Sequence, residues 1–162
     1  MLKLSTETKV IGGIGIATLI ILFGSAFLLS SKGPSEPVVK EQVVSENGLH
    51  WHPRLDIYIE DEKQEIPSGI GLAGVVHKEM HTHDEDAKDG VIHMEMNGQV
   101  IKDETKLSNF FRIWGKEFNS AQIFDKKNSE EGKVKMVVNG RDTQEFENYE
   151  MHDGDVIEIR YE

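Results

Sequence analysis

Residues 103–118 have the sequence DETKLSNFFRIWGKEF, in which apolar side chains recur at steps of three and four residues. This spacing places them on one stripe of an amphipathic helix. Asp103 or Thr105 can cap the start of the helix, because either side chain can accept a hydrogen bond from a free backbone N–H. We expect the residues of the stripe to be part of the core: Leu107, Phe110, Phe111, Trp114 and Phe118.

Strands are predicted on both sides of this helix. Residues 55–60, LDIYIE, alternate apolar and polar side chains as a half-buried strand does, and residues 61–66 predict a hairpin partner. Residues 90–96, GVIHMEM, alternate in the same way and lead into Asn97-Gly98, a common hairpin turn. Further strands are predicted at residues 133–138 and 156–161. One helix with these strands predicts a small mixed-sheet α+β domain.

The carboxy-terminal part resembles the β-grasp, or ubiquitin-like, fold. The resemblance rests on KMVVNG at residues 135–140 and MHDGDVIEIRY at residues 151–161, and it extends over residues 90–161. The chain ends in Arg160-Tyr161-Glu162, without the Gly-Gly that conjugating or sulfur-carrying members of this fold need. The resemblance therefore implies a β-grasp-like domain but no carrier function.

The amino-terminal region contains twenty consecutive uncharged residues, VIGGIGIATLIILFGSAFLL, at positions 10–29. At about 1.5 Å per residue, a helix of this length matches the hydrocarbon thickness of a bilayer. We expect a single transmembrane helix at residues 10–30 in contact with membrane lipid. The alternative is a cleaved signal peptide that ends near Gly24-Ser25-Ala26. The apolar run continues through Leu29, which favours the anchor.

The predicted helix divides the chain. Lys3 and Lys9 favour a short cytoplasmic amino terminus, residues 1–9. Residues 31–48 are rich in Ser, Pro, Gly and charge, which is typical of a flexible linker. Residues 49–162 would then be one extracytoplasmic domain of a single-pass protein of the cell membrane.

The composition excludes some functions. The chain has 18 basic and 29 acidic residues, a net charge of −11, and no cysteine. Such a surface repels nucleic acid and attracts cations and basic proteins. We therefore expect no nucleic-acid partner, and a basic protein of the cell envelope is the kind of protein partner that fits. Without cysteine, disulfides and thiolate metal ligands are excluded.

Histidines are the residues that most strongly indicate a function. Six of the 7 histidines lie between positions 50 and 93. HWHP at residues 50–53 and HTHD at residues 81–84 each contain two histidines two residues apart, whose rings share one side of an extended chain. Neutral imidazole is the commonest metal-ligating side chain. The predicted zinc or copper ligands are His50, His52, His81, His83 and His93, the last on the polar face of its strand beside Glu95.

Other interpretations of the histidines remain open. They could form a hydrogen-bonded network without metal, and His77, which follows two valines, could be a buried histidine outside the site. His152, next to Asp153 in a turn, is expected to be an ordinary surface residue. Met94 and Met96 lie on the apolar face of their strand and are expected to be core, although thioethers near histidines would suit Cu(I).

Known catalytic motifs are absent, so no catalytic residue is predicted. HKEMH at residues 77–81 does not have the glutamate register of metalloproteases, and the chain has no G-x-S-x-G or phosphate loop. A metal-dependent enzyme would need an open coordination position and a base, for which the candidates are Glu79, Asp84 and Glu95.

The motifs HWHPRLDIYI, HTHD, GVIHMEM and FFRIWGKEFN together resemble a family of small prokaryotic proteins that often have one amino-terminal membrane span. The resemblance covers residues 49–162 and implies that the histidine segments belong together. The resemblance implies no activity. From the histidine spacing we expect a membrane-anchored extracytoplasmic domain that binds zinc or copper for structure, sensing or delivery. The alternative is a protein–protein interaction module with a non-metal histidine network.

Overall fold

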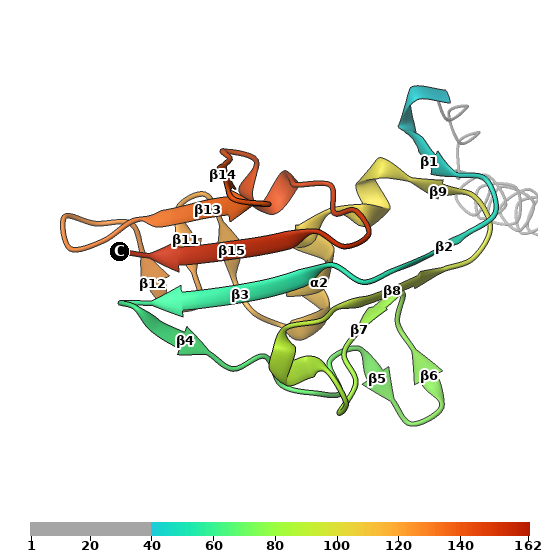
Figure 1. The fold of residues 1–162 in the computed structure, drawn as a ribbon, viewed down its shortest axis with the longest axis horizontal. Coiled ribbons are helices and arrows are strands. Elements are labelled where there is room, and N and C mark those ends of the chain that lie inside the picture. The colour runs from blue at the N-terminus through green and yellow to red at the C-terminus, as the bar shows by residue number, and fades with distance from the viewer. Residues whose placement is uncertain (1–39) are drawn as a thin grey trace, which may run out of the picture. The chain divides into compact units, whose positions relative to one another are not determined.

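A five-stranded mixed sheet lies at the centre of the part of the protein that this computed structural model describes, residues 40–162 (Figure 1). Two neighbouring strands run parallel, with Val156 opposite Arg54 and Tyr161 opposite Ile59, and every other pairing in the sheet is antiparallel. In spatial order the strands are β14 (Arg141–Asp142), β13 (Val134–Val138), β15 (Val156–Tyr161), β3 (Arg54–Ile59) and β4 (Glu62–Gln64).

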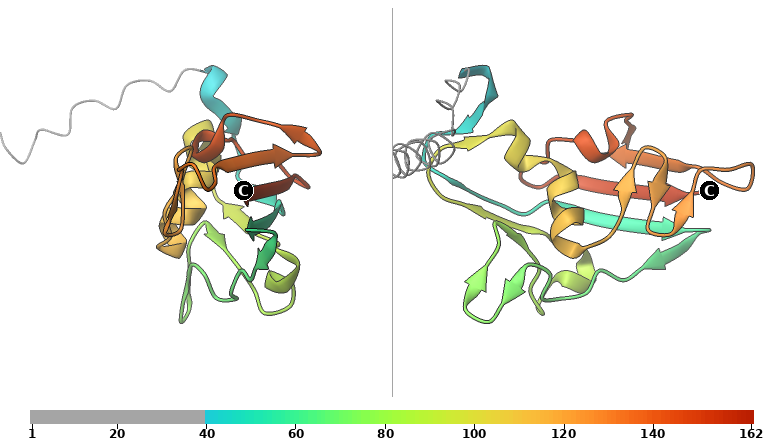
Figure 2. Two further views of the ribbon diagram at one scale, coloured as in Figure 1. Left: turned by 90° about the vertical axis from the view of Figure 1, so that its left-hand side faces the viewer. Right: turned by 180° about the vertical axis from the view of Figure 1, so that it is seen from behind.

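The one α-helix of the described residues, α2 (Leu107–Trp114), lies against a face of this sheet (Figure 2). Leu107, Phe110 and Phe111 are buried, and Trp114 is partly buried beside them. The helix ends at Gly115, which has a left-handed φ of 72° and whose N–H donates to the Arg112 carbonyl oxygen. Such a conformation is easily adopted only by glycine, so the helix stops here.

The start of α2 differs from the prediction. The residue at its amino-terminal cap is Lys106, and no side chain caps the helix. Residues Lys102–Thr105 form a short 3-10 helix, η3, in which the Thr105 hydroxyl donates to the Lys102 carbonyl oxygen. The predicted caps, Asp103 and Thr105, were therefore wrong.

A second, three-stranded antiparallel sheet carries His50, His81 and His93, one in each strand. Its strands are β2 (Leu49–Trp51), β8 (His93–Met96) and β7 (Met80–His81), with β8 in the middle. The smaller pairings are β1 (Val43–Ser45) with β9 (Val100–Ile101), β5 (Leu72–Ala73) with β6 (Val76–His77), and the series β10 (Phe118–Asn119), β11 (Gln122–Ile123) and β12 (Lys126–Lys127). The remaining 3-10 helices are η1 (Lys40–Gln42), η2 (Ala87–Asp89) and η4 (Phe146–Asn148).

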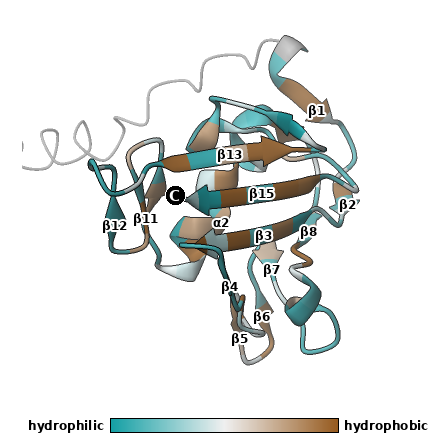
Figure 3. Cartoon of the chain, turned by 60° about the vertical axis from the view of Figure 1, so that its left-hand side comes forward, coloured by the Kyte–Doolittle hydropathy of each residue, from teal (hydrophilic) through white to brown (hydrophobic). Residues whose placement is uncertain are grey.

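One buried apolar cluster joins the two sheets and the helix. Figure 3 shows hydrophobic residues concentrated on β3, β13 and β15. Phe118 is buried in β10 and stacks on Phe111, with ring centroids 4.5 Å apart. Met94 and Met96 are buried as predicted, and Met80 is buried with them. The methionines therefore contribute to the core.

The fold class predicted from the sequence, an α+β, β-grasp-like domain behind a single transmembrane helix, is wrong. Residues 40–162 contain fifteen strands and one α-helix of eight residues, so this part of the chain is mostly sheet. Within it, no helix is long and apolar enough to span a membrane. Many of the strands have only two or three residues, too few to show an alternating pattern in the sequence.

The predicted segments have different outcomes. The predicted amino terminus, residues 1–9, and the predicted transmembrane helix, residues 10–30, lie outside the described residues. At the end of the predicted linker, residues 43–45 form strand β1 and pair with β9. The strand predicted at residues 156–161 is confirmed as β15, and those predicted at residues 55–60 and 133–138 are found as β3 and β13, with bounds that differ by one residue.

Candidate metal centre

The register of the three-stranded sheet brings the histidine segments together. On one side of β8, His50 of β2 lies opposite Glu95, and on the other side His81 of β7 lies opposite His93. Directly opposed residues in an antiparallel sheet point to the same face, as do residues two apart in one strand. All four side chains therefore share one face of the sheet. The other face carries the buried Met80 and Met94, which are also opposed.

Each histidine pair adds a second ring beside the first. The ring centroids of His50 and His52 are 4.7 Å apart, and those of His81 and His83 are 4.8 Å apart. The two rings of each pair therefore lie next to each other.

His93 lies between the two pairs. Its ring centroid is 4.8 Å from that of His52, 4.7 Å from that of His83 and 5.6 Å from that of His81. The structure thus brings all five predicted ligands into one continuous cluster.

Two further residues extend the cluster, and the sequence patterns did not point to them. His77 is exposed in β6, and its ring centroid lies 5.2 Å from that of His81, so it is not a buried histidine outside the site. Asp86 lies in the turn after His83, and its Oδ2 is 2.8 Å from His93 Nε2. The run of acidic residues after HTHD was the available signal for Asp86, but only the turn through η2 shows which carboxylate faces the histidines.

His152 lies outside this cluster. Its ring stacks on Trp51 with centroids 5.8 Å apart. It is exposed, as expected for a histidine in a turn.

Hydrogen-bond acceptors determine which ring nitrogen carries a proton in His81 and His93. His81 Nδ1 donates to the Lys78 carbonyl oxygen at 2.9 Å, and His93 Nε2 donates to Asp86 Oδ2. His50 Nε2 lies 3.2 Å from Glu95 Oε1. In a neutral ring the opposite nitrogen then has a free lone pair. A carbonyl or carboxylate on the far nitrogen is the usual partner of a metal-ligating histidine, because it orients the ring and raises its basicity.

Burial keeps His81 in the neutral form that a metal requires. The residue is fully buried, and this desolvation lowers the pKa of its imidazole below the usual value. The hydrogen bond to Lys78 and the charge of Glu95 raise the pKa, while His83 and His93 lower it further. Since desolvation is the largest of these effects, it favours the neutral ring, in which Nε2 has a lone pair for an ion.

Three groups of side chains have ligand atoms close enough to surround an ion. Within each group these atoms lie within 4.8 Å of one another, and the groups are His50, His52 and His93; His81, His83 and His93; and His77, His81 and Glu95. Zinc–nitrogen bonds of about 2.0–2.1 Å place two ligand nitrogens of a tetrahedral site about 3.3 Å apart. His81 Nε2 and His83 Nε2 are 3.1 Å apart, so this pair needs little movement to bind one ion.

The donor set limits which ions fit. Imidazole nitrogens with a nearby carboxylate suit zinc, copper(II) and nickel(II). The buried methionines are turned to the other face of the sheet, so they do not offer the thioethers that would favour copper(I).

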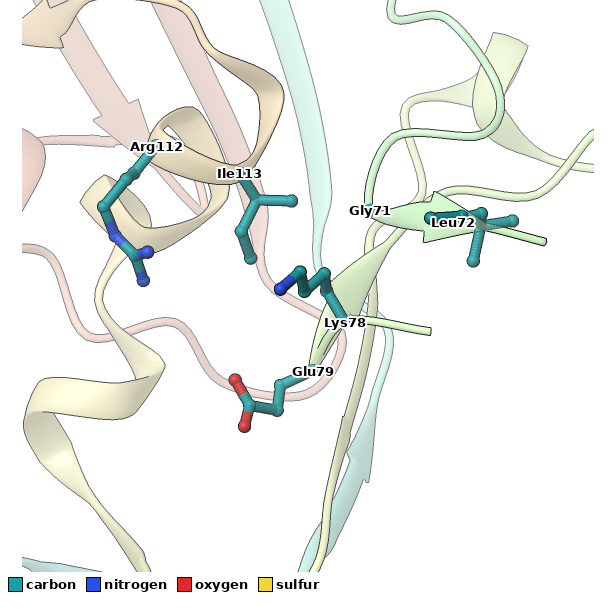
Figure 4. A pocket seen from close by; sticks show the side chains of 7 residues that line it. Gly71, Leu72, Lys78, Glu79, Arg112 and Ile113 are labelled. Carbon is teal, nitrogen blue, oxygen red and sulfur yellow. The ribbon is translucent and has the colours of Figure 1, made fainter. Parts of the chain in front are cut away.

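A pocket of about 380 Å³ is lined partly by residues that neighbour the cluster's histidines in the sequence, but none of those histidines lines it. Figure 4 shows Lys78 and Glu79 extending toward Arg112 and Ile113 of α2. Gly71 lines the same pocket with a left-handed φ of 74°, and a Cβ at this position would collide with the Met80 carbonyl oxygen. Glycine is therefore required where the chain before β5 passes close to β7, the strand that carries His81.

Comparison with known proteins adds no relative. No family model matches the chain, and no curated protein or solved structure matches it either. What the fold and the site define is a mostly β domain that gathers six histidines on one side of a small sheet.

Proposed function

We propose that the protein binds a transition-metal ion, zinc or copper, through this histidine cluster. The observation that carries the proposal is the geometry of His81. Its ring is fully buried, its Nδ1 is held by the Lys78 carbonyl oxygen, and its free Nε2 lies 3.1 Å from His83 Nε2. A ring oriented in this way, with a second imidazole at the separation of two metal ligands, is prepared for an ion.

The charges around the cluster support the same proposal. Asp86 and Glu95 each contact a histidine, and the chain has a net charge of −11. Carboxylates near neutral imidazoles offset the charge of a divalent cation, and an acidic surface raises the local concentration of cations. The ion would serve to stabilise the domain, to sense the metal or to deliver it.

The direct test is calorimetric titration of the whole chain, stripped with a chelator, with Zn(II) and Cu(II). We expect a dissociation constant in the micromolar range or below, which corresponds to about −8 kcal/mol or better. The double substitution His81→Ala and His83→Ala should weaken binding at least about 100-fold, or about 2.7 kcal/mol. The matched control is His152→Ala, which removes a histidine outside the cluster.

Two results would contradict the proposal. One is wild-type binding no tighter than about 100 μM, because several converging imidazoles should exceed about −5.5 kcal/mol. The other is unchanged binding after both His81 and His83 are replaced.

A second candidate function is an interaction module whose histidines form a polar network. The contact that favours it is again that between His81 and His83, since in the metal-free protein His83 Nε2–H can donate to His81 Nε2 at 3.1 Å. The acidic surface would then recruit a basic protein partner. This function predicts a melting temperature that is indifferent to chelator and metal. A bound ion at 100 times its dissociation constant should instead stabilise the fold by about 2.7 kcal/mol.

A further inference from the structure

His93 belongs to two groups of potential ligands at once. With His50 and His52 it forms one group, and with His81 and His83 it forms the other. The three segments come from β2, β7 and β8, and β8 lies between the other two strands (Figure 1). A single imidazole is therefore shared by two neighbouring ion positions.

Only one nitrogen of His93 is available to an ion. Its Nε2 is 2.8 Å from Asp86 Oδ2 and carries the proton of that hydrogen bond. The Nδ1 lone pair remains, and one lone pair binds one ion. While the contact with Asp86 persists, His93 can therefore bind only one ion at a time, through Nδ1.

The two groups differ strongly in their access to solvent. The side chains of His50 and His52 are 62% and 42% exposed, and that of His93 is 15% exposed. His81, in contrast, has 0% exposure. The outer position, formed by His50 and His52, is therefore more open to solvent than the inner position, formed by His81 and the half-buried His83.

We infer that the histidine cluster is a two-position relay for a divalent transition-metal ion, with His93 as the ligand common to both positions. The inference rests on the proposed metal-binding function and adds a direction to it. The ion binds first at the outer position and then exchanges ligands one at a time. A bond to His81 or His83 forms as a bond to His50 or His52 breaks, while His93 holds the ion throughout.

The proton balance of the transfer is simple. His81 already carries its proton on Nδ1, so its Nε2 can bind the ion directly. The proton that His83 carries on Nε2 in the metal-free hydrogen bond moves to its Nδ1 through solvent. No oxidant or reductant takes part, and the rings remain neutral.

The test is stopped-flow loading of the whole chain with Cu(II), followed by quenching of tryptophan fluorescence. Trp51 lies between His50 and His52 in the sequence, and in a Trp114→Phe background it is the remaining tryptophan and reports on the outer position. Equilibrium affinity is measured in parallel by competition with a chelator.

The relay predicts a different defect for each position. The variant His50→Ala/His52→Ala should load at least about tenfold more slowly and lose less equilibrium affinity than His83→Ala does. His83→Ala should keep rapid quenching and lose at least about tenfold in equilibrium affinity. His93→Ala should lose both rapid loading and affinity. The control His152→Ala removes a ring that stacks on Trp51, so it changes the fluorescence amplitude but should change neither the loading rate nor the affinity. Circular dichroism verifies that each variant is folded.

Specific results would overturn the relay. If His50→Ala/His52→Ala loaded at the wild-type rate, the ion would reach the inner position directly. If two ions bound per chain with equal affinity, the positions would not share His93. A wild-type chain that bound no ion would instead overturn the proposed function itself, so the two failures can be distinguished.

Discussion

Replacing Asp86 by asparagine should weaken metal binding while leaving the fold intact. Asp86 Oδ2 accepts a hydrogen bond from His93 Nε2 at 2.8 Å, and the two side chains are only 30% and 15% exposed. The carboxylate thus holds the proton on Nε2, orients the ring and increases the basicity of Nδ1. A neutral amide can accept the same bond but supplies no charge. Loss of such a partner weakens metal affinity by about 10- to 100-fold, or about 1.4–2.7 kcal/mol.

The assay is competition of the Asp86→Asn variant against a chelator of known affinity, with a thermal melt of the metal-free protein alongside. Asp89→Asn is the matched control, because Asp89 lies in the adjacent η2, is exposed and loses the same charge. The reasoning would be refuted if both variants lost affinity equally, since the effect would then be long-range charge. It would also be refuted if Asp86→Asn bound metal like the wild type.

Three further predictions concern the metal-free protein. Burial lowers the pKa of His81, so just below pH about 6.5 this histidine takes up a proton in the unfolded state but not in the folded state. The free energy of unfolding, measured by melts in the presence of chelator, should therefore fall as the pH drops through this range. A free energy that does not change with pH would contradict this prediction. Gly71→Ala should cost about 1–3 kcal/mol in urea unfolding, more than Gly74→Ala, since a Cβ at Gly71 meets backbone whereas one at Gly74 meets open space. Equal costs would refute the collision. Asp155→Ala should lower the free energy of unfolding by about 3 kcal/mol in the same assay. The reason is that the buried carboxylate accepts hydrogen bonds from Asn139, Tyr149 and the backbone N–H of His152. A decrease below about 1 kcal/mol would contradict this prediction.

Local features of the protein follow from the sequence by itself. The alternation in residues 156–161 is sufficient to predict β15, because a strand with one buried face must repeat every two residues. The same period accounts for the buried Met94 and for the neighbouring rings within each histidine pair. All of these are properties of a few adjacent residues, and backbone geometry alone determines them.

The tertiary structure decides which of these local features meet. The helix predicted over residues 103–118 ends before Gly115 in the structure. The short strands that follow have too few residues to show a periodic pattern in the sequence. Pairing of β8 with β2 and β7 joins segments far apart in the chain, and only its register sets His50 opposite Glu95 and His81 opposite His93. A shift of one residue would turn these side chains to the other face. His93 likewise belongs to two groups of potential ligands and contacts Asp86 only because three strands and a turn pack together. No local pattern in the sequence encodes such contacts between distant residues.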